Sequence, residues 1–502
     1  NTPPSTRVSD YSWAGYLQVL YTIGAMQVNP FIFRNYDIRG IAGTDLDTQI
    51  VEAIGKAYGT FLNKRKIHEI VAARDSRLTG KEYQQAFVRG VISTGVDIID
   101  LGEVMTQMMY FGQYRFQTNG GVMVTASHNP WNFNGFKLAI AFSQTTGPQE
   151  VQEIRELVEK DAYFIAKTPG KVTSADIKED YSRDVLKRIR LKSKFKVVAD
   201  SHHGTTGLYN PEILRRAGCE VTEVRTNVDG SFPAGTPDPT DAHLMEDLAK
   251  HVLENQADIG FAYDGDGDRM GIVDDKGRIL WNDVAVAIFA REILERFPGS
   301  KIIYNTLCSQ IVRKVIEEDK GIPIIWRVGH AFIKEKIAKE GAMFGGELSG
   351  HFFFADNAYG HDDGTYASLR ILEYLSEKGL SLSELFDQFP KYISSPEIKI
   401  GCPDDKKVSV IKDLADKFRK DFSGAKITDD TIIPGDDGVR ADFDDGMMVF
   451  RYSQNGPYIT VKFEAKDEKT FEERRQYTSR MLHAYQEMIW EDQLCVNLDF
   501  VK

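Results

Sequence analysis

The sequence predicts an α/β fold of several mixed-sheet domains followed by a smaller α+β unit. First, short β-branched runs precede loops rich in Gly, Asp, Ser or Asn, and an amphipathic, helix-like stretch follows each loop. Second, the pattern changes after Pro403 to a Lys-rich helix, short strands and a final helix over about residues 467–491. The runs of the first kind are residues 70–73, 121–124, 197–199, 259–263 and 301–304.

Length and turn signals divide the chain into four domains. At roughly 150 residues per domain, 502 residues make three to four domains. Turn-rich segments near residues 168–170, 274–278 and 396–403 mark the boundaries. The expected division is an N-terminal extension over residues 1–30 and domains over residues 31–168, 169–278, 279–396 and 397–502. In such sheets, ligands bind at the carboxyl ends of the strands, where the polar loops fall.

The composition is that of a globular protein, with 42% hydrophobic and 27% charged residues. A net charge of -12 argues against general nucleic-acid affinity, but it is compatible with an anionic small substrate where cations gather locally. The four cysteines lie far apart without a C-x-x-C spacing, which favours cytosolic free thiols. Residues 11–33 carry no charge but lack an apolar run of about 18 residues, so we expect a packed helical extension rather than a membrane anchor.

Ser127 is the first candidate catalytic residue. The apolar run at 121–124 delivers it into the hexapeptide Thr-Ala-Ser-His-Asn-Pro, residues 125–130, where proline prevents regular structure from continuing. A lone serine is usually a turn residue. No Gly-x-Ser-x-Gly elbow surrounds Ser127, so a hydrolase nucleophile is poorly supported. A phosphate carrier fits this loop better.

Asp264, Asp266 and Asp268 are candidate ligands of a hard cation such as Mg²⁺. Only glycine separates them, so an irregular loop can fold all three carboxylates around one ion. An EF-hand is excluded because Arg269 and Asp275 occupy the positions that need Gly and Glu. Three aspartates and a serine phosphate carry about -5, so nearby cations must offset what Mg²⁺ does not. The candidate cations are Arg269, Arg39, Arg74 and Arg77.

Glu347 and Ser349 are candidate sugar ligands. They stand one residue apart among glycines, whose missing side chains leave room for two vicinal hydroxyls of a sugar. Three motifs together resemble the α-D-phosphohexomutase family: the serine motif (residues 125–130), the aspartate motif (residues 264–269) and the glutamate motif (residues 345–351). His351 directly after Gly350 is most similar to the phosphomannomutase/phosphoglucomutase branch, and the resemblance extends from about Phe31 to the C-terminus.

The resemblance implies three similar α/β domains and a smaller fourth domain around a central cleft. It implies Mg²⁺ on the three aspartates and Ser127, and a phosphoserine at Ser127 that gives its phosphoryl group to the sugar. A hexose 1,6-bisphosphate is the implied activator. Lys137 resembles a general acid/base, His351 a proton shuttle or phosphate contact, and His330 a residue that discriminates the orientation of the sugar. For Lys137 and His351, a solvated lysine and a satisfied structural histidine are the alternatives.

The turn that begins at Arg451 is the candidate site for a second phosphate. Arg451 and Ser453 keep the places that they have in the family, and Asn455 with backbone N–H groups would complete a phosphate cradle. The three residues after Ser453 depart from the family's usual Asn-Thr or Gly-Thr. Leu307 stands where related enzymes often carry lysine. Both departures bear on substrate affinity and identity rather than on the serine chemistry.

The leading prediction is an enzyme that interconverts hexose 1-phosphate and 6-phosphate, with mannose, glucose or both, through a hexose 1,6-bisphosphate. Its catalysis would rest on positioning and charge stabilisation. The alternatives are a phosphosugar phosphatase, a non-catalytic sugar-phosphate-binding regulatory protein, and a phosphoglucosamine mutase, which Leu348 disfavours because that branch commonly has Gln there. The expected partner is a small phosphosugar, with neither nucleic acid nor membrane, and we expect a cytoplasmic monomer or dimer.

Overall fold

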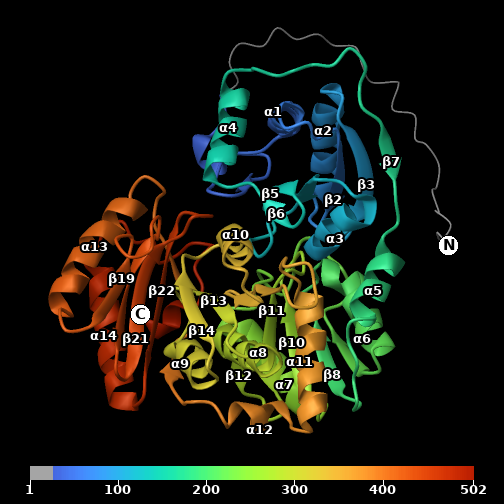
Figure 1. Ribbon diagram of the computed structural model, residues 1–502. Coiled ribbons are helices and arrows are strands. Elements are labelled where there is room, and N and C mark those ends of the chain that lie inside the picture. The colour runs from blue at the N-terminus through green and yellow to red at the C-terminus, as the bar shows by residue number, and fades with distance from the viewer. Residues whose placement is uncertain (1–26) are drawn as a thin grey trace.

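Four sheets follow one another along the chain in the computed structural model, which describes residues 27–502. Three of them form α/β domains with mixed sheets, and the last belongs to a smaller, antiparallel domain, as the sequence predicts (Figure 1). The helical extension expected at residues 11–33 lies largely outside the described residues. Within residues 27–502, no helix is long and apolar enough to cross a membrane.

The first sheet combines parallel and antiparallel strands. Its strands are β1 (Ile38–Ile41), β2 (Glu69–Arg74), β3 (Asp97–Glu103), β4 (Gly120–Val124), β5 (Phe133–Ala141), β6 (Gln144–Thr145) and β7 (Val172–Ser174), with helices α1 (Thr48–Lys64), α2 (Gly80–Ser93), α3 (Thr106–Phe116), α4 (Pro148–Glu159) and the 3₁₀ turn η1 (Pro30–Ile32). The strand order is β1-β5-β4-β2-β3-β7, with β6 paired to β5. Ile70 and Ala72 share a core with α1, α2 and α4, whereas Val71 and Ala73 pack with α3, because successive side chains of a strand point to opposite faces.

The second sheet ends in a hairpin that carries the aspartate loop. Its elements are β8 (Lys196–Asp200), β9 (Glu220–Val224), β10 (Ile259–Tyr263), β11 (Met270–Asp274), β12 (Ile279–Leu280), α5 (Lys178–Leu186), α6 (Asn210–Arg216), α7 (Ala242–Glu254) and η2 (Thr205–Leu208). β8 is parallel to β9 and β10, whereas β11 is antiparallel to β10. The polar residues between β10 and β11 are therefore held at the carboxyl end of a buried strand.

The third sheet has the order β14-β13-β15-β16. Its elements are β13 (Lys301–Asn305), β14 (Ile322–Trp326), β15 (Phe344–Gly346), β16 (Phe352–Phe354), α8 (Asn282–Arg296), α9 (Gln310–Glu318), α10 (His330–Glu340), α11 (Gly364–Lys378) and α12 (Leu382–Phe386). β15 and β16 pair as an antiparallel hairpin, and its turn carries the glutamate motif. The loop after β14 leads into α10 at His330.

The fourth domain is an antiparallel sheet flanked by two helices. Its elements are β17 (Ile393–Ser394), β18 (Ile398–Gly401), β19 (Lys426–Asp429), β20 (Gly438–Phe443), β21 (Gly446–Tyr452), β22 (Tyr458–Ala465), α13 (Lys407–Asp421), α14 (Glu468–His483) and η3 (Leu498–Phe500). α14 ends at His483, earlier than the expected residue 491. The chain beyond it returns along β18, where Ile489 and Val496 bridge to Gly401 and Lys399.

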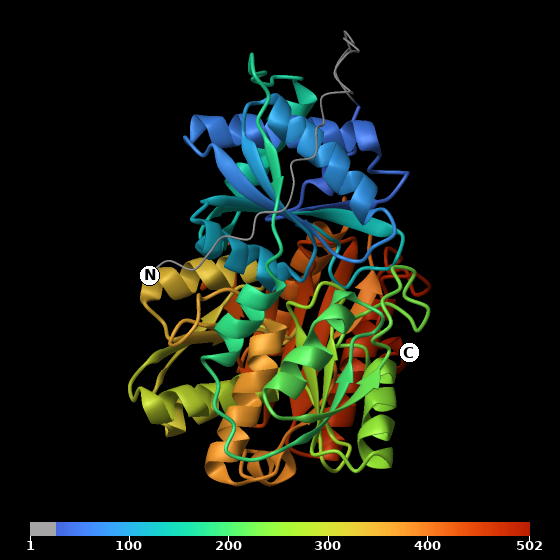
Figure 2. The same ribbon diagram turned by 90° about the vertical axis from the view of Figure 1, so that its right-hand side faces the viewer.

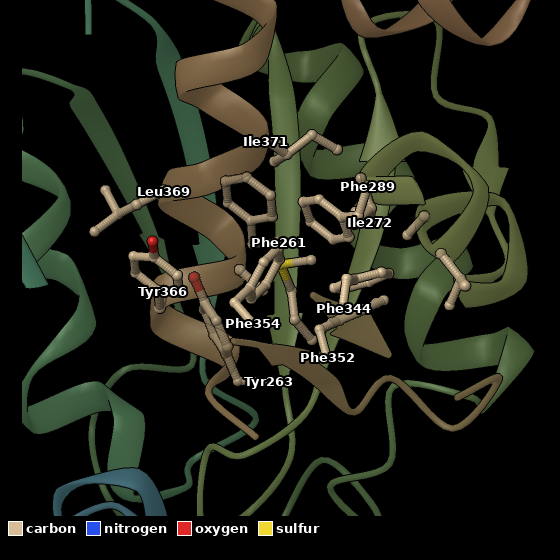
Figure 3. Packing of buried hydrophobic residues seen from close by; sticks show 14 of the residues in the cluster. Phe261, Tyr263, Ile272, Phe289, Phe344, Phe352, Phe354, Tyr366, Leu369 and Ile371 are labelled. Atoms are coloured by element: carbon tan, nitrogen blue, oxygen red, sulfur yellow. The ribbon is translucent and has the colours of Figure 1, made fainter. Parts of the chain in front are cut away.

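The largest core runs through the first three domains and also includes Met447 and Val449 of the fourth. Figure 3 shows aromatic rings from β10, β16, α8 and α11 meeting in it. The ring of Phe289 lies edge-on to Phe352 and Phe354, at centroid distances of 5.1 and 5.0 Å. Edge-to-face aromatic contacts of this kind add to the free energy of area burial. The second and third domains are thereby packed as one base below the first domain (Figure 2).

Two short strands fall beyond the boundaries expected from turn signals. β7 follows residue 168 but pairs with β3 of the first sheet, and β17 precedes residue 396 but pairs with β22 of the fourth. Strands of two or three residues are too short to show a period-2 pattern, so a sequence boundary set by Gly and Pro cannot detect them.

Candidate active site

Ser127 stands in a strained loop at the carboxyl end of β4. Its φ of 52° lies in the left-handed region, which is uncommon for a residue other than glycine. The loop is held by local bonds: the N–H of Ser127 donates to Oγ1 of Thr125 at 2.8 Å, and that hydroxyl donates to Asp75 at 2.6 Å. The hydroxyl of Ser127 is buried and donates to Oδ2 of Asp264 at 2.7 Å. The serine and aspartate motifs therefore meet.

Arg77 holds the serine loop through its backbone. Its guanidinium donates to the carbonyl oxygens of Ser127, Asn129, Pro130 and Phe133, at 2.6 to 3.0 Å. Because these bonds use its terminal amino groups, Arg77 stabilises the loop that presents the serine rather than reaching toward a ligand in the cleft. A buried arginine bound to four carbonyls is a rigid support for a strained turn.

Arg39 and Arg74 also differ in what they contact. Arg39, on β1, pairs with Asp37 at 2.7 Å and donates to Oδ1 of Asn129 at 3.3 Å. It therefore supports the serine loop. Arg74 instead pairs with Glu103 at 3.3 Å. Of the four arginines that the sequence offers as counter-charges, only Arg269 lines the cleft.

The aspartate loop is folded tightly against the serine loop. Oδ1 of Asp264 accepts from the N–H groups of Gly267 and Arg269, at 3.0 and 3.1 Å. A side chain at Gly265 would bring its Cβ to 2.7 Å from the carbonyl oxygen of Ser127, so this position admits only glycine without a shift of the backbone. The glycines between the aspartates thus permit the two loops to approach.

The three aspartates fit a hard divalent cation. One carboxylate oxygen from each aspartate lies within 4.8 Å of the other two, and all three residues are buried. Oδ1 of Asp266 and Oδ1 of Asp268 have no hydrogen-bond partner, which is unfavourable for buried carboxylates without a cation. Burial, with Asp266 and Asp268 nearby, holds the pKa of Asp264 well above its usual range. Oxygen ligands of this kind are those that Mg²⁺ prefers.

Lys137 lies on β5 and forms ion pairs with two of the three aspartates. Its Nζ is 2.7 Å from Oδ2 of Asp266 and also contacts Asp268. Burial acts to lower the pKa of Lys137, but the charges of Asp266 and Asp268 outweigh it, so this pKa is raised. Lys137 is therefore an ammonium ion in this arrangement, and not the solvated surface lysine that its sequence context alone would suggest.

A cleft opens beside the serine loop, where all four domains meet. His128, Arg269, Glu347 and Arg451 line it from the first, second, third and fourth domain in turn. The central cleft expected from the sequence is thus present. Its walls carry several cations, which suits an anionic ligand although the whole chain is acidic.

The glutamate motif forms a tight turn on one wall of the cleft. The N–H of Gly350 donates to the carbonyl of Glu347 at 3.0 Å, and Oε1 of Glu347 accepts from Gly329 N–H at 2.8 Å and from Asn305 at 3.1 Å. Glu347 is buried, whereas Ser349 is half-buried, and both line the cleft. The turn presents them side by side.

Two histidines lie next to this turn. Nε2 of His351 accepts from Nε of Arg269 at 2.9 Å, which joins the glutamate and aspartate motifs. His330 packs edge-on against Tyr36, and neither of its ring nitrogens has a hydrogen-bond partner although it is buried. Burial and the ammonium group of Lys334 hold the pKa of His330 well below its usual range. A neutral imidazole with unpaired nitrogens is free to bind a polar ligand.

The fourth-domain loop differs in detail from the phosphate cradle expected from the sequence. Arg451 pairs with the buried Asp437, with Nε at 2.8 Å from Oδ1. The hydroxyl of Ser453 accepts from the N–H groups of Asn455 and Gly456, at 3.1 and 3.2 Å, so these N–H groups already have a partner. The side chain of Asn455 donates to the hydroxyl of Tyr36 at 2.6 Å and so ties the fourth domain to the first.

Two residues in or behind the cleft wall, Lys399 and Asp362, have no distinct signal in the sequence. Lys399 lines the cleft and pairs with Asp238 at 2.5 Å, and the pair is buried. Asp362 is fully buried with Oδ2 at 2.9 Å from Nδ1 of His351. In the sequence, Asp362 looks like part of a helix cap, and the next residue, Asp363, does cap α11. Leu307 is fully buried in the largest core, where a charge would be unfavourable.

Fold and site together define a class: multidomain α/β proteins in which a buried serine faces a carboxylate cluster beside a cation-lined cleft. Comparisons with known proteins agree. The chain matches the family described as phosphoglucomutase/phosphomannomutase, with alpha/beta/alpha domain I over residues 30–164, domain II over residues 179–277 and domain III over residues 281–392. The chain belongs to this family, which confirms the resemblance found in the sequence.

Individual relatives are similar over almost their whole length. The chain is 36% identical to a phosphomannomutase/phosphoglucomutase of Pseudomonas syringae pv. tomato, covering 88% of this chain and 92% of the relative. It is 35% identical to a phosphoglucomutase of Neisseria meningitidis serogroup A, covering 91% and 98%. A crystal structure of a phosphoglucomutase/phosphomannomutase family protein from Burkholderia thailandensis has a TM-score of 0.81 and 32% identity, covering 91% and 98%.

Proposed function

We propose that this protein is a phosphohexomutase that interconverts hexose 1-phosphate and hexose 6-phosphate, with mannose, glucose or both. The observation that carries the proposal is the 2.7 Å contact between the hydroxyl of Ser127 and Asp264, beside a cleft lined by all four domains. Membership of the phosphoglucomutase/phosphomannomutase family supports the reaction class. The active form would carry a phosphoryl group on Ser127.

The reaction would proceed as two phosphoryl transfers. In the first, the bond between Oγ of Ser127 and phosphorus breaks as the free hydroxyl of the hexose phosphate bonds to that phosphorus and loses its proton, which gives a hexose 1,6-bisphosphate. The bisphosphate turns around, and its other phosphoryl group returns to Ser127. Added hexose 1,6-bisphosphate would phosphorylate a resting enzyme by the second step alone. Such transfers depend mainly on positioning and charge.

Asp264, Asp266, Asp268 and Ser127 would hold Mg²⁺. When bound, the ion supplies Lewis-acid stabilisation of charge on the transferring phosphoryl group. Lys137, which is protonated beside Asp266, is the proposed acid that gives a proton to the departing oxygen of Ser127, and it then takes up the proton that the attacking sugar hydroxyl loses. The reverse step uses the same two proton transfers in the opposite direction. Arg269, held by His351, places a fixed positive charge on the cleft wall.

The sugar and its second phosphate would bind across the remaining walls. Glu347 and Ser349 present an acceptor and a hydroxyl to neighbouring sugar hydroxyls. His330, with its unpaired nitrogens, would read the orientation of the ring. Arg451 and Ser453 are the proposed ligands of the phosphate that is not transferred, and Asn455 and Lys399 line the cleft next to them. Arginine suits this task because its donors match phosphate oxygens in pairs.

Replacing Arg451 should weaken substrate binding. We expect Arg451→Ala to raise KM by roughly tenfold or more, because a charge-assisted hydrogen bond is typically worth about 1.5 to 3 kcal/mol. Arg451→Lys should recover part of this loss, since it keeps the charge but not the paired donors. Steady-state kinetics measure both.

The matched control is Arg419→Ala. Arg419 also pairs with an aspartate of the fourth domain, Asp429 at 2.7 Å, but it lies outside the cleft. The KM of the Arg419→Ala variant should equal that of the wild type. A wild-type KM and kcat for Arg451→Ala would show that this loop does not hold the second phosphate, and would favour a different substrate or a non-catalytic role.

The function itself is tested by a substrate panel. Purified protein with Mg²⁺ and a catalytic amount of glucose 1,6-bisphosphate should convert glucose 1-phosphate or mannose 1-phosphate into the 6-phosphate. Glucosamine 1-phosphate should react poorly if the protein is not a phosphoglucosamine mutase. Binding of sugar phosphates without any turnover would instead support the regulatory alternative.

A further inference from the structure

We propose that Asn497 is a positioning residue, which fastens the fourth domain to the second and thereby holds Lys399 in the wall of the cleft. Asn497 lies in the segment that follows α14. Its Nδ2 donates to the carbonyl oxygens of Thr240 and Glu397, at 2.9 and 2.7 Å, and its Oδ1 accepts from the N–H of Ala242 at 2.9 Å. Thr240 and Ala242 belong to the second domain, so one side chain joins backbone groups of two domains.

The residue type fits this position in two ways. A carboxamide has two N–H donors and one oxygen, and because its partners here are two carbonyls and one N–H, they fix which atom of the amide is the nitrogen. Asn497 also has a φ of 59°, in the left-handed region that asparagine tolerates better than most residues. Ala242 is the first residue of α7, where an N–H has no partner within the helix, so Asn497 supplies that partner from another domain.

Lys399 is held by the same segment of chain. Val496, the neighbour of Asn497, exchanges both backbone hydrogen bonds with Lys399, each at 3.0 Å. β18, which carries Lys399, therefore lies between β22 and the segment that contains Val496. From the other side, Oδ2 of Asp238 lies 2.5 Å from Nζ of Lys399, and both side chains are buried. Asp238 in turn accepts from the N–H and the hydroxyl of Thr240, at 3.0 and 2.7 Å.

Residues 238–242, Lys399 and Asn497 together form what we call the interdomain clasp. A buried ion pair and two hydrogen bonds of the clasp join the second domain to the fourth. Leu494, three residues before Asn497, packs with Ala126 of the serine motif, so the same segment also lies against the first domain. The clasp therefore fixes the fourth domain close to the loop that presents the serine.

The clasp would hold the two phosphate positions apart at a constant distance, a consequence that rests on the proposed function. These positions are at Ser127 in the first domain and at Arg451 in the fourth, and the hexose 1,6-bisphosphate has to turn around between them. A loosely held fourth domain would let the bisphosphate leave before the second transfer. Ser127 would then keep a free hydroxyl, and it would need a phosphoryl group from added hexose 1,6-bisphosphate, which leaves as the monophosphate.

Asn497→Gly tests the clasp by kinetics. Glycine adopts a φ of 59° without strain but lacks the amide, so the backbone can stay in place while the three hydrogen bonds are lost. We expect the glucose 1,6-bisphosphate needed for half-maximal activity to rise by at least about fivefold and KM for glucose 1-phosphate by about threefold, with kcat at saturation within about twofold of the wild type. Asn497→Asp keeps the shape and the acceptor but loses the donors, so it should show the same changes.

The matched control is Asn255→Gly. Asn255 also donates from Nδ2 to a backbone carbonyl, that of His251 at 2.8 Å, but this bond lies within the second domain. The kinetic constants of the control should equal those of the wild type. If Asn497→Gly has the wild-type KM and the wild-type requirement for glucose 1,6-bisphosphate, the positioning role is wrong.

Hydrogen exchange measures the fastening without any activity. The N–H groups of Lys399 and Val496 are protected by the bonds that they exchange, and neither bond involves the side chain of Asn497. We expect β18 to exchange at least about tenfold faster in Asn497→Gly than in the wild type, whereas α14 should exchange equally in both and so report an intact fold. Equal exchange of β18 in the two proteins would overturn the clasp. Faster exchange in a protein without mutase activity would support the clasp and refute the proposed function, so the two failures are distinguishable.

Discussion

The Ser127→Ala variant should lose at least about 10³-fold in mutase turnover while it keeps its fold, because removal of a covalent carrier has an effect of this size or larger. The hydroxyl contacts Oδ2 of Asp264 at 2.7 Å and Nδ1 of His128 at 3.3 Å, and alanine fits the same space. Loss of one buried hydrogen bond lowers the free energy of unfolding by only about 1 kcal/mol. Turnover of glucose 1-phosphate and circular dichroism, measured on the same preparation, separate chemistry from folding.

Ser182→Ala is the matched control for this variant. Ser182 is also a buried serine, but it lies on α5 and does not line the cleft. It should turn over substrate as the wild type does. In addition, incubation with labelled glucose 1,6-bisphosphate should label the wild type and the control but not Ser127→Ala. Wild-type turnover by Ser127→Ala would remove this serine from the mechanism.

The sequence alone predicts the parts of the site that rest on local patterns. A buried strand that ends in a polar, glycine-rich loop places its side chains at the carboxyl edge of the sheet, and this rule located Ser127 after β4, Asp264 after β10 and Glu347 after β15. The spacing of the aspartates predicts a cation site because it depends only on the loop itself. Length and turn signals predict four domains, and the family resemblance adds that these domains surround one central cleft.

Residues whose role depends on distant contacts could not be predicted in this way. Asp362 reaches His351, and Lys399 reaches Asp238 from another domain. Nothing in the neighbouring sequence specifies such a partner. For the same reason, the sequence suggests that Arg77 offsets negative charge in the site. In the structure, its guanidinium instead donates hydrogen bonds to four backbone carbonyl oxygens of the serine loop.

Removal of the metal should stop turnover almost completely and reversibly. We expect excess EDTA to abolish mutase activity and added Mg²⁺ to restore it, because no side chain can replace a divalent charge on the transferring phosphoryl group. The fold should survive, since Lys137 pairs with Asp266 and Asp268 and offsets part of their charge. The melting temperature should therefore change little while activity is lost.

Asp266→Asn tests which residues hold that metal. Asparagine keeps an oxygen that can accept from Thr106, whose hydroxyl donates to Asp266 at 2.6 Å, but it loses the charge that binds both Mg²⁺ and Lys137. Half-maximal activity should then require at least about tenfold more Mg²⁺. Asp229 lies in a half-buried turn away from the aspartate triad, where its carboxylate accepts from the N–H of Ser231, so Asp229→Asn should leave the Mg²⁺ requirement unchanged. Full activity of the wild type in excess EDTA, with no metal found by elemental analysis, would contradict a metal-dependent mechanism. An unchanged Mg²⁺ requirement for Asp266→Asn would show that Asp266 does not bind the ion.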